Sequence, residues 1–269
     1  MPHISKTVAY SGIAVVSLFV IIASFWYKSE SIKTKTQEEL LATSLFITKG
    51  NMVTEQGSEY TVEGELPSIP FDVKGGKEAT LSLAKLYRKK IEDFKQQAKQ
   101  SYASAPNELI HDNVKSSYYL SSKKIAETKR YISILVEEET YFIGMAHPSH
   151  DLATYIFDKE KNKLVDVTTL FLEDSLYRQR LSSLSRAFFE QKNKNANRDD
   201  VVIDTTLDNE GFSATRENFG RLLPTPLGLI IYFKEYQIAP YAAGMQQALL
   251  PYDEILDDLD WEGVLGDYK

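Results

Sequence analysis

Two histidines and an aspartate stand close together in residues 147–151, which read His-Pro-Ser-His-Asp. Imidazole and carboxylate groups are ligands that zinc accepts, so His147, His150 and Asp151 are candidate metal ligands. Residues three apart on an extended strand point to opposite faces, however, and only a turn brings both imidazoles to one ion. No third partner is evident. The pattern therefore favours a structural turn over a metal site, and we predict no cofactor.

A second candidate is the segment 240–244, which reads Pro-Tyr-Ala-Ala-Gly. Its small residues would let a ligand approach the backbone, while Tyr236 and Tyr241 offer rings with polar tips. The same residues are also typical of a tight crossover that packs closely against a sheet. We favour the structural interpretation and keep Tyr236, Pro240, Tyr241 and Gly244 as possible ligand contacts.

Acidic residues gather near the C-terminus and begin a pattern like that of a calcium-binding loop. The pattern starts at Asp258, but its twelfth position is Lys269, where calcium needs a bidentate acid. The acids fit better in the solvated end of a helix over residues 252–259 and in an acidic tail over residues 257–269. They are Asp253, Glu254, Asp257, Asp258, Asp260, Glu262 and Asp267.

Catalytic motifs are absent from the sequence. It has no cysteine, nucleophile elbow, phosphate loop, dinucleotide fingerprint or two-histidine zinc helix. We therefore predict no enzymatic activity, and keep as an alternative a wall-modifying hydrolase whose dispersed carboxylates only geometry would reveal. The net charge of −7 disfavours nucleic acid as a partner.

Hydrophobic periodicity predicts an α+β fold of two intimately associated halves, with antiparallel sheets each packed against a long helix. A hairpin is expected from residues 45–48 and 59–65. Helices are expected over residues 77–101 and 175–191, where apolar residues recur at helical spacing. Short strands are expected elsewhere, as antiparallel neighbours because their connections are short. These are residues 118–120, 125–137, 140–142, 153–157, 201–203, 212–215, 227–233 and 247–250.

Residues 8–27 form a stretch of twenty uncharged residues. At about 1.5 Å of rise per residue, a helix of this length crosses the roughly 30 Å hydrocarbon core once. Bulky aromatic residues at positions 25–27 replace the small residues of a cleavage site. We predict a retained transmembrane helix held in the lipid bilayer, with a cytoplasmic stub over residues 1–7 and a stalk over residues 28–44.

Two further stretches carry a family resemblance. Residues 142–148 read Phe-Ile-Gly-Met-Ala-His-Pro, with Thr-Tyr-Ile-Phe-Asp following at 154–158, and residues 229–252 include the Pro-Tyr-Ala-Ala-Gly segment. They resemble the C-terminal domain of the RsiV anti-sigma factor family, and the resemblance covers residues 141–256. Residues 45–140 are weakly similar to the domain that precedes it in that family and in the peptidoglycan deacetylase PdaC.

The sequence departs from the family pattern at Met145, where a second glycine is common. If that glycine takes a positive φ, the turn must differ here, because a Cβ atom penalises that conformation. Only seven residues precede the apolar stretch, which is too few for an anti-sigma domain. We therefore do not expect control of a sigma factor.

The resemblance implies an extracytoplasmic sensor or binding module, because the RsiV family includes a lysozyme receptor and the deacetylase domain lies beside wall sugars. We expect a single-pass cell-membrane protein whose C-terminal part lies outside the cytoplasm. The lysines flanking residues 8–27 by themselves favour the opposite orientation. The expected ligand is an extracellular protein such as lysozyme or a wall glycan. A structural or assembly role beside another membrane protein is an alternative, and the sequence does not determine the oligomeric state.

Overall fold

The computed structural model describes residues 51–197 and 201–260 of the chain. The predicted stub, membrane helix and stalk, residues 1–7, 8–27 and 28–44, lie outside these ranges, as does the acidic tail beyond residue 260. Among the helices within these ranges, none combines the length and the apolar character needed to cross a bilayer.

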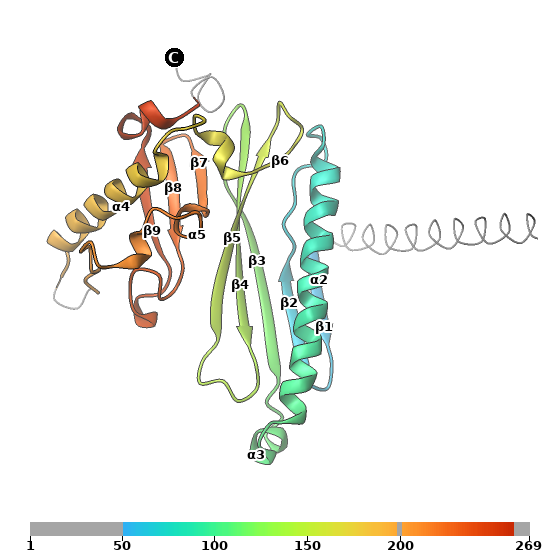
Figure 1. Ribbon diagram of the computed structural model, residues 1–269. Coiled ribbons are helices and arrows are strands. Elements are labelled where there is room, and N and C mark those ends of the chain that lie inside the picture. The colour runs from blue at the N-terminus through green and yellow to red at the C-terminus, as the bar shows by residue number, and fades with distance from the viewer. Residues whose placement is uncertain (1–50, 198–200, 261–269) are drawn as a thin grey trace, which may run out of the picture. The chain divides into compact units, whose positions relative to one another are not determined.

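A six-stranded sheet, with its strands in the order β1 to β6, forms the first part of the described chain (Figure 1). The strands are β1 (Met52–Gln56), β2 (Tyr60–Glu65), β3 (Ser116–Glu127), β4 (Tyr131–Tyr141), β5 (Ser149–Asp158) and β6 (Lys163–Val165). Helices α2 (Gly76–Ala103) and α3 (Asn107–His111) connect β2 to β3. These two strands run parallel, while every other neighbouring pair in this sheet is antiparallel.

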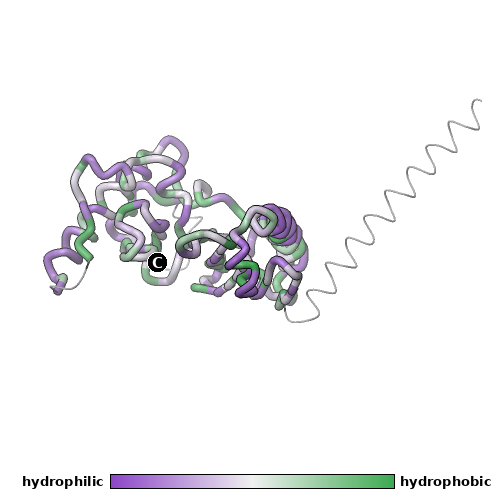
Figure 2. Tube along the Cα trace, turned by 90° about the horizontal axis from the view of Figure 1, so that it is seen from below, coloured by the Kyte–Doolittle hydropathy of each residue, from purple (hydrophilic) through white to green (hydrophobic). Residues whose placement is uncertain are grey.

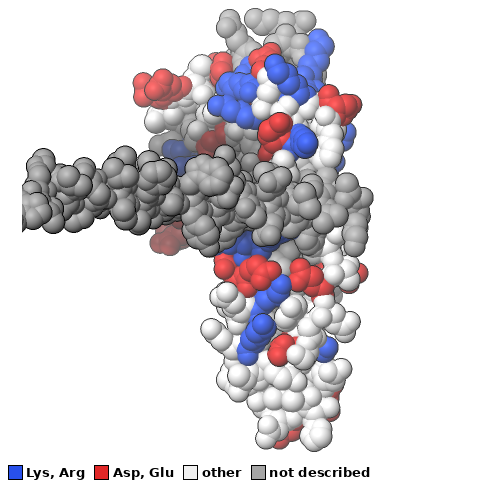
Figure 3. All heavy atoms as spheres, turned by 90° about the vertical axis from the view of Figure 1, so that its right-hand side faces the viewer, with Lys and Arg blue, Asp and Glu red and all other residues white. Residues whose placement is uncertain are grey.

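Helix α2 packs against β2 and β3 through one apolar stripe. Its buried residues include Leu83, Tyr87, Ile91, Phe94 and Ala98, which recur every three or four positions and so share one face. The remaining residues of α2 are mostly hydrophilic (Figure 2). On the molecular face that carries α2, acidic and basic side chains lie interspersed, and the lower part is largely uncharged (Figure 3).

A second, three-stranded antiparallel sheet follows, with β7 (Leu222–Thr225), β8 (Gly228–Phe233) and β9 (Gln246–Pro251). Helix α4 (Tyr177–Lys194) packs against β9, and the short α5 (Arg216–Phe219) contacts β8. Short 3₁₀ turns complete the chain: η1 (Val167–Leu170), η2 (Glu210–Phe212), η3 (Tyr241–Ala243), η4 (Tyr252–Glu254) and η5 (Leu256–Asp258).

Strand β4 is covered on both faces, and all six residues from 131 to 136 are buried. On one face, Tyr131 and Leu135 join the apolar core built from the small sheet and α4. On the same face, the hydroxyl of Ser133 donates to the carbonyl oxygen of Pro224 on β7 at 2.6 Å. The opposite face lies toward α2. Strand β4, together with its neighbours β3 and β5, thus packs against β7 and joins the two sheets into one unit.

On the face of β4 that lies toward α2, the last buried residue is an acid, Glu138. Its oxygens accept hydrogen bonds from the Tyr118 hydroxyl and the Lys90 ammonium, each at 2.5 Å. Burial, followed by the hydrogen bond to Glu138, raises the pKa of Tyr118 well above its usual value. The phenol therefore stays protonated and donates, so that the buried carboxylate has two partners.

The predicted α+β class is confirmed, and each sheet packs against one long helix. Both helix predictions are confirmed to within three residues at each end. The expectation of purely antiparallel sheets is wrong for β2 and β3. Parallel pairing requires a long crossover, and helix α2 provides it.

Several strand predictions are wrong. The strand predicted over 125–137 is broken by a turn at 128–130, where the backbone N–H of Tyr131 donates to the Thr128 hydroxyl at 2.9 Å. Residues 201–203 and 212–215 are not strands, and Phe212 is instead buried at the end of η2. The tail at 252–259 forms two 3₁₀ turns instead of a helix.

Strands β1 and β7 also differ from the prediction. The partner of β2 is Met52–Gln56, whereas residues 45–48 lie outside the described part of the chain. Strand β7 was not predicted, because Pro224 disfavours a strand. The predicted boundary between domains 45–140 and 141–256 falls within β4, and β5 and β6 continue the same sheet.

The turn between β5 and β6 is closed by Asp158, whose side chain is fully buried. One carboxylate oxygen accepts from Nε and Nη2 of Arg130, at 3.1 and 3.0 Å. The other accepts from the backbone N–H groups of Glu160 and Lys161, both at 2.9 Å. The carboxylate thus fixes the turn and neutralises Arg130.

Replacing Asp158 by alanine should lower the free energy of unfolding by about 3–5 kcal/mol, because the largely buried Arg130 guanidinium loses its partner. Glu160→Ala is the control, since this carboxylate lies 3.3 Å from Arg130 but is 69% exposed. It should change stability by less than about 1 kcal/mol. Urea titration followed by circular dichroism measures both values, and equal losses in the two variants would contradict the assignment.

Candidate ligand-binding site

Four rings meet where the turn between β4 and β5 contacts the loop after β8. The ring of Tyr241 lies 4.1 Å from that of His147, 6.2 Å from that of His150 and 5.7 Å from that of Tyr236, measured between centroids. The interplanar angles are all close to 30°. We call His147, His150, Tyr236 and Tyr241 the ring cluster. His147 and Tyr236 are exposed, so the cluster is open to solvent.

Tyr241 ties the two segments together. Its hydroxyl donates to the carbonyl oxygen of Pro148 at 3.2 Å. Desolvation, and next the carboxylate of Glu235, raise the pKa of this phenol above its usual value. The hydroxyl therefore remains a neutral donor, and the ring is held in place between the two loops.

His150 lies between two carboxylates. Its Nδ1 is 2.7 Å from an oxygen of Glu235, and its Nε2 is 3.2 Å from an oxygen of Glu139. Ionised carboxylates only accept hydrogen bonds, so both contacts are satisfied together when each ring nitrogen carries a proton. In that state His150 is an imidazolium held by two acids, and neither nitrogen is available to a metal or as a general base.

The three candidate metal ligands, His147, His150 and Asp151, do not converge. Nδ1 of His147 lies 2.9 Å from the carbonyl oxygen of Pro148, and His150 is held by Glu139 and Glu235. Asp151 forms an ion pair with Lys234 and accepts from its own neighbour, the backbone N–H of Leu152. Within residues 51–197 and 201–260, no three His, Asp or Glu side chains are arranged to hold a metal ion.

Tyr236 is held in the left-handed backbone region, with φ of 61°. Its turn is closed by the backbone N–H of Gln237, which donates to the carbonyl oxygen of Lys234 at 3.1 Å. The side-chain amide of Gln237 donates to the carbonyl oxygen of Gly211 at 3.1 Å. A Cβ atom at Gly211 would lie 1.7 Å from the Gln237 oxygen, so this close contact requires glycine. The surrounding loops thus impose a strained conformation on an exposed aromatic residue.

The segment 240–244 forms the turn η3, with Pro240 before it and Gly244 after it. Gly244 has φ of 63°, and a Cβ atom there would have no neighbour within 4 Å. The backbone conformation, and not close packing, is therefore what favours glycine at this position. In the turn between β4 and β5, Gly144 has a positive φ of 93°. The backbone N–H of Met145 donates to the carbonyl oxygen of Phe142 at 2.9 Å.

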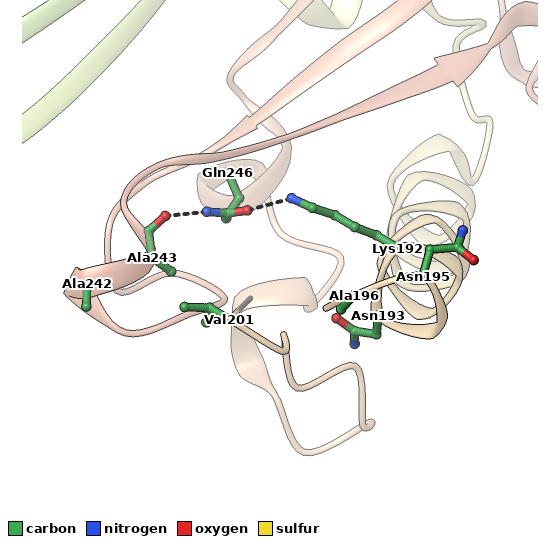
Figure 4. A pocket seen from close by; sticks show the side chains of 8 residues that line it. All are labelled: Lys192, Asn193, Asn195, Ala196, Val201, Ala242, Ala243 and Gln246. Carbon is green, nitrogen blue, oxygen red and sulfur yellow. Dashed lines mark hydrogen bonds between the residues drawn. The ribbon is translucent and has the colours of Figure 1, made fainter. Parts of the chain in front are cut away.

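A cavity of about 510 Å³ adjoins the two alanines of this segment (Figure 4). Lys192 reaches across it from the end of α4 and donates to the side-chain oxygen of Gln246 at 3.1 Å. The amide of Gln246 in turn donates to the carbonyl oxygen of Ala243. The described lining residues are Lys192, Asn193, Asn195, Ala196, Val201, Ala242, Ala243 and Gln246. The small residues next to Tyr241 therefore leave open space beside the backbone.

Two acids of the site were not predicted. Glu139 faces His150 directly across the β4–β5 pair. A hairpin centred between residues 144 and 145 pairs these two positions, so a register argument could have found Glu139. Glu235 lies in the loop after β8 of the small sheet. No local pattern could have placed it beside His150, which is 85 positions earlier in the chain.

Comparison with known proteins identifies part of the chain. Residues 168–253 match the family described as "Protein of unknown function (DUF3298)", so a DUF3298 domain is present. This range contains α4, the small sheet and the two tyrosines of the ring cluster. The two histidines precede it, and the ring cluster therefore joins the domain to the large sheet.

The predicted similarity to PdaC is confirmed. The chain is 28% identical over 182 residues to the peptidoglycan-N-acetylmuramic acid deacetylase PdaC of Bacillus subtilis. The alignment covers 66% of this chain and 35% of PdaC, so the chain spans about a third of the length of that relative.

Two solved structures share the fold. A DUF3298 family member from Bacteroides fragilis superposes with a TM-score of 0.57 at 15% identity, covering 81% of this chain and 95% of that one. A DUF3298 family protein from Pseudomonas aeruginosa gives 0.50 at 13% identity, covering 78% and 93%. At such identities the likeness concerns the fold alone.

The strain at Tyr236 leads to a stability prediction. Tyr236→Gly and Tyr236→Ala both remove the ring, but only glycine adopts the positive φ without a penalty. The glycine variant should therefore be more stable to urea than the alanine variant, by about 1 kcal/mol. Equal unfolding free energies would show that the loop relaxes and stores no strain.

Proposed function

We propose that this chain is a membrane-anchored, extracytoplasmic binding module of the cell envelope, whose ring cluster binds a wall glycan. The observation that carries the proposal is the cluster itself, in which four rings lie together at the surface beside two carboxylates. Aromatic faces pack against the apolar faces of sugars, and the Glu139 carboxylate, whose side chain is 42% exposed, can also accept hydrogen bonds from sugar hydroxyls. Similarity to a peptidoglycan deacetylase supports the same class of ligand.

The arrangement favours binding without catalysis. Both nitrogens of His150 lie within hydrogen-bonding distance of carboxylates, so neither is directed at a substrate. The raised pKa of Tyr241 keeps its phenol neutral. An inverting glycosidase would have to hold water beside two convergent carboxylates, whereas Glu139 and Glu235 are occupied on opposite sides of one ring.

A protein ligand such as lysozyme is the second candidate. It is supported by the resemblance to the RsiV family and by the net charge of −7, which attracts a basic protein. An extracellular partner of this kind would meet the same exposed rings.

Glycan binding should depend on Tyr241. In the full-length protein, Tyr241→Ala should weaken binding of a peptide-free peptidoglycan tetrasaccharide by about tenfold, because the ring between the two loops is lost. Phe71→Ala is the matched control, since Phe71 is 53% exposed and lies outside the ring cluster. Isothermal titration calorimetry measures both, and lysozyme is titrated in parallel. Tyr241-dependent binding of lysozyme alone would replace the glycan by a protein ligand, and equal affinities of the two variants would refute the site.

Anchoring by residues 8–27 makes a separate prediction. The full-length chain should sediment with membranes after high-salt washing and appear in solution only with detergent, because a stretch of twenty uncharged, mainly apolar residues would hold it in the bilayer. A protease added to intact cells should digest the C-terminal part if it lies outside. Recovery in the soluble fraction would contradict the anchor, and protection in intact cells would contradict the orientation.

A further inference from the structure

A shallow depression of about 310 Å³ lies beside β5. Residues 152–154 of β5 line one side, and three cationic side chains, Arg216, Arg221 and Lys234, line the other. Glu217 and Gly220 complete the lining. The depression therefore presents backbone groups and positive charges together in a protein that is otherwise acidic.

Arg221 is the cation without a carboxylate partner. Arg216 pairs with Asp166 at 2.7 Å, and Lys234 pairs with Asp151. The Arg221 guanidinium donates to the carbonyl oxygen of Glu217 at 2.8 Å, and no described carboxylate forms an ion pair with it. Burial lowers the pKa of Arg221. A half-buried guanidinium with unfilled donors gains most from an incoming anion.

The neighbouring edge of β5 also lacks a strand partner over part of its length within the described residues. Strand β6 pairs only with the last three residues of β5, Ile156–Asp158. From Ser149 to Tyr155, the outer edge of β5 has no strand partner in the part of the chain that the structure describes. Such an edge offers backbone N–H and C=O groups that can bind amide groups of a ligand.

The depression adjoins the ring cluster. Lys234, which lines it, is followed directly by Glu235, which holds His150. Leu152, which also lines it, is two residues after His150 on β5, so the two side chains lie on the same face of the strand. Residues two apart on a strand are separated by about 6.6 Å, so a ligand lying on the rings reaches the depression within one or two sugar units.

We infer that the depression receives a carboxylate of the glycan, so that the module selects wall glycans that carry carboxylates and acetamido groups, as muramic acid residues do. The inference rests on the proposed function, because the ring cluster holds the sugar that brings the carboxylate to Arg221. Two carboxylates, Asp151 and Glu217, act on Arg221 electrostatically. Asp151 is paired with Lys234, and the exposed Glu217 opposes an anion only weakly because water and salt screen it, whereas Arg221 is half-buried.

Two tetrasaccharides that differ mainly in the carboxylates form the test. One contains only N-acetylglucosamine and is neutral. The other alternates N-acetylglucosamine with N-acetylmuramic acid and is free of peptide. The full-length protein should bind the acidic tetrasaccharide about tenfold more tightly than the neutral one, and the preference should shrink as salt rises.

Arg221→Gln should remove this preference, because glutamine keeps a polar side chain but no charge. Arg180→Gln is the matched control, since Arg180 is an exposed arginine on α4, outside the depression. Arg221→Lys serves as a second variant if the glutamine variant fails to fold. It keeps the charge but loses the planar fork, and should retain part of the preference.

The outcomes separate the inference from the proposed function. Equal binding of both tetrasaccharides with full dependence on Tyr241 would overturn the inference and leave the ring cluster intact. A preference that depends on Arg221 but not on Tyr241 would support the depression and refute the ring cluster. Absence of binding to either tetrasaccharide would overturn both, and an unchanged preference in Arg221→Gln would overturn the inference alone.

Discussion

Burial of β4 on both faces is the constraint on which the rest of the structure depends. Its residues alternate between the α2 side and the small-sheet side, and a one-residue slip in register would exchange the two sets. Such a slip would move Glu138 away from Tyr118 and Lys90 into an apolar core. The cost of burying an unpaired carboxylate makes the observed register the only one compatible with both layers.

The register of β4 also determines the site. It places Glu139 opposite His150 on the side that faces the small sheet, beyond the part of β4 that β7 covers. The small sheet then adds Glu235, Tyr236 and Tyr241 from the loop after β8. The rings therefore stay exposed while the strands beneath them are rigid, which is the arrangement that preorganises a binding surface.

Charge is distributed unevenly around this surface. Two carboxylates, those of Glu139 and Glu235, contact His150 of the ring cluster. The adjoining depression is lined by three cations, of which Lys234 pairs with Asp151. An acceptor-rich patch for hydroxyls next to a donor-rich patch for an anion suits a ligand with both kinds of group. The strain at Tyr236 belongs to the same surface, since loops far apart in the chain hold its ring in place.

The sequence by itself determined the α+β class, both long helices, the apolar stretch at 8–27 and the PdaC similarity, because periodicity, length and motif are local properties of a chain. It also selected His147, His150, Tyr236 and Tyr241 as candidates. Only the tertiary structure decided that these residues meet, that β2 and β3 are parallel, and that Asp151 faces Lys234. Such contacts join residues tens of positions apart, and they depend on register and packing, which no local pattern encodes.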